Sequence, residues 1–244
     1  MIEQGKRAGK FLLDALYPRV CPVCRDVVTP KGGLICTECR EKLPYVTEPA
    51  CMRCGRPVFS EQDEFCSSCS QQTFRYERGF AVFTYDDVMQ QAVADFKYRN
   101  QRELAEFFAE ELADVFQTKM YDLGAEVFVP VPVHKARKRY RGYNQAEVLC
   151  KLLARQTGIP MRELLRRDRK TAPQKELDAA DRLRNLEQAI SLEPEEQGCK
   201  LPKTVVLVDD IYTTGSTAEA CTRILLRAGI EKVFLLNLCI VSEQ

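Results

Sequence analysis

The feature that most constrains the fold is a set of four Cys-x-x-Cys turns in the first third of the chain, with eleven residues between one turn and the next. Two such turns direct four thiolates at one metal ion and complete the tetrahedral Cys₄ site of structural zinc. The spacing therefore predicts two structural zinc ions. The predicted ligands are Cys21, Cys24, Cys36, Cys39, Cys51, Cys54, Cys66 and Cys69.

A disulfide scaffold and a redox-active dithiol are the alternatives to zinc. Disulfide scaffolds belong to secreted chains, and the apolar cluster at residues 11–16 is interrupted by Asp14 and is too short for a signal peptide. A thioredoxin-type dithiol is a single pair rather than four in a row. Reduced thiols, zinc sites and the lack of an export signal lead us to expect a cytoplasmic protein.

The sequence leaves the pairing of the four turns open. Sequential pairing joins the first two turns and then the last two, whereas a cross-braced arrangement interleaves them. We favour sequential pairing because links of eleven residues suit short hairpins. Since a Cys₄ zinc site has no open coordination position, this segment predicts a metal-stabilised fold rather than an activity.

Length and composition divide the chain into a small metal module and one ordinary domain. The 244 residues are 45% hydrophobic with a formal net charge of +1, so nucleic acid would have to be bound by a local patch. No apolar stretch approaches the ~20 residues of a membrane span. We expect a short helix over residues 1–20, a double zinc ribbon over residues 21–72 and a second domain over residues 78–244.

Strands and helices alternate in the second domain. The apolar patterns predict strands at residues 79–85, 126–131, 164–165, 204–208 and 232–240. They predict helices at residues 87–98, 103–120, 144–156, 179–186 and 216–228. Strands that alternate with helices of this length favour an α/β fold with a mostly parallel sheet covered on both faces.

The most chemically specific segment is VVLVDDIYTTGST at residues 205–217. Its pattern predicts a buried strand with two carboxylates at its end, followed by a small polar loop and then a helix. Ligands of open α/β sheets bind beyond the carboxyl ends of the strands. Helix N–H groups favour phosphate, and Gly215 allows close backbone approach. The carboxylates suit sugar hydroxyls or a metal. The alternative is an ordinary βα turn with Ser216 or Thr217 as the N-cap.

This segment resembles the signature loop of type I phosphoribosyltransferases, which bind phosphoribosyl pyrophosphate (PRPP). The resemblance extends to the ComF family through the four cysteine turns, PVPVH at residues 130–134, RGYNQA at 141–146 and TAPQ at 171–174. It implies a phosphoribosyltransferase-type fold, PRPP bound with Mg²⁺, and an association with natural competence and the uptake of transforming DNA. It implies that Asp209 and Asp210 are catalytic and hold the ribose hydroxyls. The 5′-phosphate would be held by Thr213, Thr214, Gly215, Ser216 and Thr217.

A basic segment follows the strand at residues 126–131, and we expect it to be a loop at the ligand-binding edge. A cluster of one sign attracts anions, either the pyrophosphate of PRPP or a nucleic-acid backbone. Its candidate contacts are Lys135, Arg137, Lys138, Arg139 and Arg141. Tyr140 and Tyr143 are candidates for base stacking, with burial expected for at least one. A lone histidine such as His134 is usually a hydrogen-bonded structural residue.

Within the polar stretch at residues 166–188, the segment at residues 166–174 is interpreted as a mobile cover, as in phosphoribosyltransferases. The candidates of the whole stretch for reaching the phosphates are Lys170, Gln174 and Arg182. A second basic group, at residues 97–99, is explained by the preference of cations for a helix C-terminus.

The sequence is consistent with two functions. One is a PRPP-binding protein of DNA uptake, which also contacts single-stranded DNA and docks uptake proteins on its zinc ribbons. The other is an active phosphoribosyltransferase of nucleotide metabolism unrelated to competence. The residues identify no acceptor pocket, and they leave turnover open.

Overall fold

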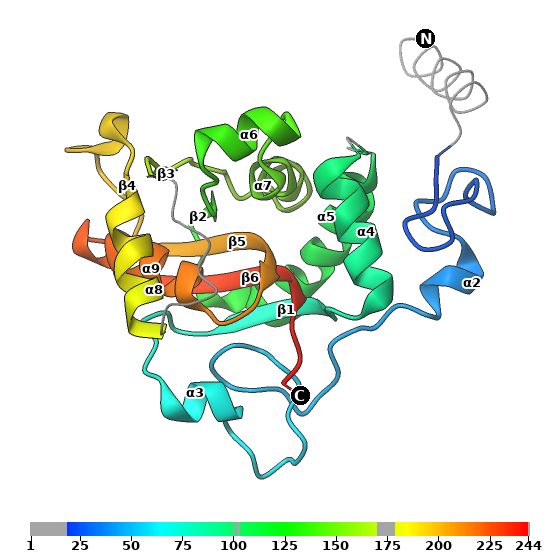
Figure 1. The fold of residues 1–244 in the computed structure, drawn as a ribbon, viewed down its shortest axis with the longest axis horizontal. Helices are drawn as coiled ribbons and strands as arrows, with labels where there is room; N and C mark the ends of the chain where they lie inside the picture. The colour runs from blue at the N-terminus through cyan, green and yellow to red at the C-terminus, as the bar shows by residue number, and fades with distance from the viewer. Residues whose placement is uncertain (1–18, 100, 102, 170–178, 244) are drawn as a thin grey trace.

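The structure, a computed structural model, describes residues 19–99, 101, 103–169 and 179–243 (Figure 1). The helix predicted over residues 1–20 and the loop candidates Lys170 and Gln174 lie outside the described residues, apart from residues 19 and 20. The side chain of Arg182 is also outside this description.

The second domain is built on one parallel sheet of four strands in the order β1-β6-β5-β2. These strands are β1 (Gly79–Thr84), β2 (Val127–Pro130), β5 (Thr204–Tyr212) and β6 (Lys232–Ile240). Strand β5 is central: Val205 pairs with Val127 on one side and with Val233 on the other. The predicted parallel α/β sheet is confirmed.

Helices cover both faces of this sheet (Figure 1). Val206 and Val208 of β5 lie in one hydrophobic cluster, and Val205 and Leu207 lie in the other. Because side chains alternate across a strand, a central strand needs apolar residues at every position. The first cluster includes α4 (Asp87–Tyr98), α5 (Leu104–Val115) and α7 (Gln145–Thr157), and the second includes α8 (Ala179–Ala189) and α9 (Ser216–Arg227).

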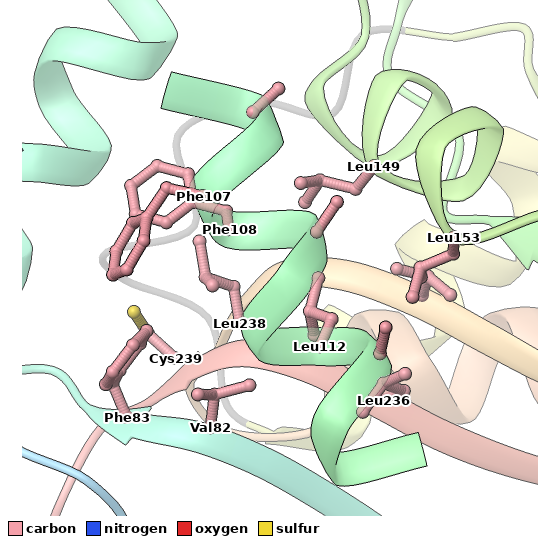
Figure 2. Close-up of a cluster of buried hydrophobic side chains, with 14 of the residues drawn as sticks. Val82, Phe83, Phe107, Phe108, Leu112, Leu149, Leu153, Leu236, Leu238 and Cys239 are labelled. Atoms are coloured by element: carbon pink, nitrogen blue, oxygen red, sulfur yellow. The ribbon is translucent and has the colours of Figure 1, made fainter. Parts of the chain in front are cut away.

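The first cluster is the larger of the two. Figure 2 shows Phe107, Phe108 and Leu112 of α5 in the layer between the helices and the strands β1 and β6, with Leu149 and Leu153 of α7 on the other side of α5 from the two phenylalanines. All three side chains are essentially inaccessible to solvent. Burying a large apolar side chain contributes roughly 1.5–3 kcal/mol, so this layer fixes α5 and α7 against the sheet.

Three segments differ from their predicted form. The helix expected to reach residue 120 ends as α5 at Val115 and continues as a π-helix, Phe116–Met120, and a 3₁₀ turn, Tyr121–Leu123. The short strand expected at residues 164–165 is β3 (Leu165–Arg167), which pairs with β4 (Ile190–Leu192) in a separate antiparallel sheet. A further 3₁₀ turn spans Pro194–Glu196.

The cysteine-rich segment forms two small units that dock on the sheet domain. The first contains α2 (Thr37–Arg40) and contacts α5, where Arg40 Nη1 lies 2.8 Å from Glu111 Oε1. The second contains α3 (Ser67–Gln71) and contacts the start of β1. A Cβ atom on Gly55 would lie 2.6 Å from the carbonyl oxygen of Gly79, so only glycine permits this approach.

No helix within the described ranges is both long enough and apolar enough to cross a membrane.

Candidate functional site

The eight predicted zinc ligands form two groups in sequential pairing. Cys21, Cys24, Cys36 and Cys39 form the first group, Cys51, Cys54, Cys66 and Cys69 form the second, and the sulfurs of each group lie within 4.8 Å of one another. Sγ–Sγ distances of 3.9 Å for Cys24–Cys36 and 3.7 Å for Cys54–Cys66 match the ~3.8 Å edge of a tetrahedron with Zn–S bonds of ~2.3 Å. Both groups fit structural zinc, and the favoured sequential pairing is confirmed.

Asp209 and Asp210 lie within strand β5, close to its carboxyl end. The strand continues to Tyr212, four residues beyond the predicted end, and α9 begins at Ser216. The N-cap of α9 is Gly215, with φ of 79° and no side-chain cap. The predicted alternative, with Ser216 or Thr217 as the cap, is therefore wrong. The first N–H groups of α9 have no capping side chain, which leaves them available to an anion.

A glycine is required at position 215 because the side chains of Tyr212 and Phe74 pack directly against it. A Cβ atom at this position would overlap the Tyr212 hydroxyl and lie 2.9 Å from Phe74 Cε1. The positive φ adds strain for any other residue. A substitution at Gly215 would therefore disturb the fold of the loop before it blocked a ligand.

The two carboxylates lie beside a lysine from a distant helix. Lys97 Nζ, in the last turn of α4, is 2.7 Å from Asp210 Oδ1, and the two side chains are only 13% and 14% exposed. The backbone N–H of Asp210 donates to Asp209 Oδ1 at 2.8 Å. Lys97 therefore forms an ion pair with a candidate site residue, whereas the sequence predicts only that it ends its helix.

The carboxyl group of Asp209 is perturbed by its surroundings. Burial and the adjacent Asp210 raise the pKa of Asp209 to about 7, against the opposing effects of Lys97 and Arg141. Paired carboxylates with a raised pKa are typical of functional sites, because a stability-driven arrangement would separate them.

The raised pKa of Asp209 predicts a loss of stability at neutral pH. The unfolded chain ionises this group near its ordinary pKa of 3.8, whereas the folded protein keeps the proton up to about pH 7. Its contribution to the free energy of unfolding therefore falls as pH rises through this window. We expect Asp209→Asn to increase the free energy of unfolding by about 1–3 kcal/mol near pH 8 and by much less near pH 4.

Thermal unfolding at both pH values tests this prediction. Asp122→Asn, which changes an exposed carboxylate, is the control. The same shift in Tm for Asp209→Asn at both pH values would contradict the assignment of the raised pKa.

The basic segment is a helix, α6 (Lys135–Arg141), and not the predicted loop. Lys138 Nζ lies 2.7 Å from Glu147 Oε2, and Arg141 donates to Gln145 Oε1 at 3.0 Å. These two cations are therefore engaged within the protein. The remaining three are exposed and form no ion pair within the described part of the chain: Lys135, Arg137 and Arg139.

Two exposed tyrosines lie on this surface. Tyr98 at the end of α4 is 59% exposed and Tyr140 of α6 is 82% exposed, with ring centroids 6.5 Å apart. The Arg141 guanidinium lies 4.9 Å from the Tyr98 ring centroid. Tyr143, the other stacking candidate, is buried and its hydroxyl donates to the carbonyl oxygen of Phe96. The exposed aromatic rings at this place are therefore those of Tyr98 and Tyr140.

His134 has the structural role expected of a lone histidine. It is the N-cap of α6, and its Nδ1 accepts a hydrogen bond from the N–H of Ala136 at 3.1 Å.

The cysteine-rich segment matches a known domain. The family model described as "Double zinc ribbon domain" matches residues 12–70.

Curated relatives match over most of the chain. Competence protein F of Haemophilus influenzae is 31% identical over 87% of this chain and 93% of its own length. DNA utilization protein YhgH of Salmonella typhimurium is 30% identical over 91% and 97%. Competence protein ComFC of Bacillus subtilis is 29% identical over 80% and 79%.

Solved structures of adenine phosphoribosyltransferases are more distantly similar. The enzyme from Rhodothermus marinus has 20% identity and a TM-score of 0.36, covering 59% of this chain and 70% of that chain. The enzyme from Leishmania tarentolae has 13% identity and a TM-score of 0.37, covering 61% and 75%.

Proposed function

The chain belongs to the ComF family of competence proteins, and from that premise we propose that it binds PRPP with Mg²⁺ in the service of DNA uptake. The observation that carries the proposal is the junction of β5 and α9. There, two adjacent carboxylates, Asp209 and Asp210, precede a helix whose first turn has no side-chain cap.

The loop and the carboxylates at this junction suit the phosphate and the hydroxyls of a ribose phosphate, respectively. The N–H groups and hydroxyls of Thr213, Thr214, Ser216 and Thr217 would donate to the 5′-phosphate. Asp209 and Asp210 would accept from the ribose hydroxyls. Carboxylate oxygens also suit Mg²⁺, which would neutralise charge on the diphosphate.

The cations around this edge suit the pyrophosphate. Lys97 already lies against Asp210, and Arg141 is close enough to influence the charge of Asp209. A phosphate group near these cations would gain charge-assisted hydrogen bonds. We propose that Lys97 changes partner on binding, from Asp210 to a phosphate oxygen.

Calorimetric titration of PRPP into the zinc-loaded protein tests the proposal. Binding is expected with Mg²⁺ and is expected to weaken in buffer from which Mg²⁺ is omitted without a chelator, since a chelator would remove zinc. An absence of binding under both conditions would refute it.

A second function, the binding of single-stranded DNA, is favoured by the Tyr98–Tyr140 pair. Aromatic rings that stack on bases and cations that track the phosphate backbone are the two elements of sequence-independent binding to single strands. Lys135, Arg137 and Arg139 supply exposed cations on the same helix as Tyr140.

We expect the triple variant Lys135→Ala, Arg137→Ala, Arg139→Ala to bind single-stranded DNA more weakly than the wild type. Each lost phosphate contact makes the negative slope of log K against log salt shallower by roughly 0.7 for single strands. Fluorescence anisotropy over a salt series measures both effects. The control is Lys138→Ala, since Lys138 is occupied by Glu147. An unchanged slope in the triple variant would exclude this surface.

We propose a reducing, cytoplasmic location. All twelve cysteines are free thiols in the structure and eight of them suit zinc, a state that oxidising compartments do not maintain. Fractionation of cells that produce the full chain tests this, and recovery outside the cytoplasm would contradict it.

A further inference from the structure

A buried arginine connects the second zinc ribbon to the loop that precedes α9. Arg56 is 4% exposed, and its Nη2 donates to the carbonyl oxygen of Thr213 at 2.8 Å. Its Nη1 lies 2.7 Å from Glu243 Oε1. The two contacts place one guanidinium between the ribbon, the loop that joins β5 to α9, and the segment that follows β6.

The position of Arg56 depends on the cysteine turn that precedes it. The N–H of Cys51 donates to the carbonyl oxygen of Arg56 at 2.7 Å, and the N–H of Gly55 donates to the carbonyl oxygen of Cys51 at 2.9 Å. This turn brings the sulfurs of Cys51 and Cys54 into one group of four that would hold a zinc ion. Metal binding would therefore fix the backbone from which the Arg56 side chain extends.

Glu243 ties the other cysteine turn into the same contact. Its Oε2 accepts from the N–H of Ser67 at 2.9 Å, and its Oε1 accepts from the N–H of Ser68 at 2.9 Å. Ser67 and Ser68 lie between Cys66 and Cys69 of the second zinc site. Arg56 and Glu243 thus join both halves of this site to the loop.

Residues 74–76, which follow the second ribbon, pack against the loop between β5 and α9 and against α9 itself. The hydroxyls of Tyr76 and Tyr212 are 2.8 Å apart, and the N–H of Arg75 donates to Glu219 Oε2 in α9 at 2.7 Å. Phe74 lies against Gly215. The loop and the start of α9 are therefore held in place by the second ribbon and by residues 74–76 as well as by the sheet.

We infer that Arg56 is a positioning residue for PRPP binding and that zinc at the second ribbon and PRPP at the loop are thermodynamically coupled. This inference rests on the proposed function. A loop ordered before binding loses less conformational entropy on binding. If zinc orders the loop through Arg56, PRPP must strengthen zinc retention by the same factor.

The test compares Arg56→Met with Arg40→Met. Arg40 also follows a zinc-binding turn and pairs with the sheet domain through Glu111, but it belongs to the first ribbon. Each full-length variant is first checked for two zinc ions per chain. We expect Arg56→Met to bind PRPP about 10-fold or more weakly and Arg40→Met to bind within about 2-fold of the wild type. Arg56→Lys, which keeps the charge but not the two-pronged contact, should fall between.

A second measurement does not depend on PRPP. Amide hydrogen exchange of residues 212–218 should be faster in zinc-loaded Arg56→Met than in the wild type, and unchanged in Arg40→Met. Wild-type affinity and wild-type exchange in Arg56→Met would overturn the inference. If the wild type fails to bind PRPP, the proposed function falls, and the exchange rates alone decide whether Arg56 orders the loop.

Arg56→Met could lose the second zinc ion, and Glu243→Gln then takes its place. This variant leaves all eight cysteine ligands and the Thr213 contact intact while removing the charge that holds Arg56. We expect a smaller loss of PRPP affinity with faster loop exchange. Two zinc ions with unchanged affinity and exchange would overturn the inference.

Discussion

Replacing both Asp209 and Asp210 by asparagine is expected to weaken Mg²⁺-dependent PRPP binding by about 100-fold or more. Hydrogen bonds to a charged group contribute about 1.5–3 kcal/mol each, so two lost carboxylates remove roughly 3–6 kcal/mol. The change is isosteric, so we expect the fold of β5 to be retained. Calorimetry with and without Mg²⁺ measures the loss.

The role of Lys97 makes this prediction sharper. Asp210→Asn removes the negative partner of Lys97, which frees a cation that attracts phosphate. Binding that depends on phosphate alone would therefore strengthen in the variant, whereas binding that uses the carboxylates for ribose and Mg²⁺ weakens. The control is Asp114→Asn with Asp122→Asn, two exposed acids outside the site. Unchanged, Mg²⁺-dependent affinity in the Asp209 and Asp210 variant would refute their assignment.

The second large effect concerns zinc. Sequential pairing predicts that Cys24→Ser with Cys36→Ser keeps one zinc ion per chain, because both ligands belong to the first site. Cys24→Ser with Cys54→Ser is expected to lose both ions. Each lost zinc costs several kcal/mol of folding free energy, so we expect Tm to fall by ~10 °C or more for the first pair and further for the second.

Metal analysis of the two purified double variants decides between pairings. They change the same number of cysteines, so they control for each other. A cross-braced arrangement with alternate turns sharing an ion would reverse the two zinc contents, and that reversal would contradict the structure.

The sheet could be predicted because its signal is local. The run Val205–Val208 is apolar at every position, and a strand with this pattern must be covered on both faces. The helices of at least eleven residues between successive strands of the main sheet then require parallel crossovers. The antiparallel pair of β3 and β4 was missed, because its strands have three residues each and are separated by 22 residues of polar sequence.

Helix α6 was missed because its charge dominates its sequence. Five of its seven residues are Lys or Arg, and like charges on one helix repel. The helix is supported by its ends and by a neighbour: His134 caps its start, Gly142 ends it with φ of 82°, and Glu147 of α7 neutralises Lys138. The last of these contacts depends on the tertiary fold.

The candidate site was predicted in part. The carboxylates, the small polar loop and α9 are contiguous, so one motif identifies them. Lys97 reaches Asp210 across 113 positions, and Arg56 reaches Thr213 across 157. Local sequence patterns do not predict contacts between residues this far apart in the chain. The sequence predicts that Gly215 allows a ligand to approach the backbone, whereas its close contacts with Tyr212 and Phe74 depend on the tertiary packing.

The most direct test of the central claim is a crystal structure of the zinc-loaded protein with PRPP and Mg²⁺. We predict that the 5′-phosphate lies against the N–H groups of residues 214–217 and that the ribose hydroxyls face Asp209 and Asp210. PRPP bound elsewhere on the molecule, or with its ribose turned away from both carboxylates, would contradict this account.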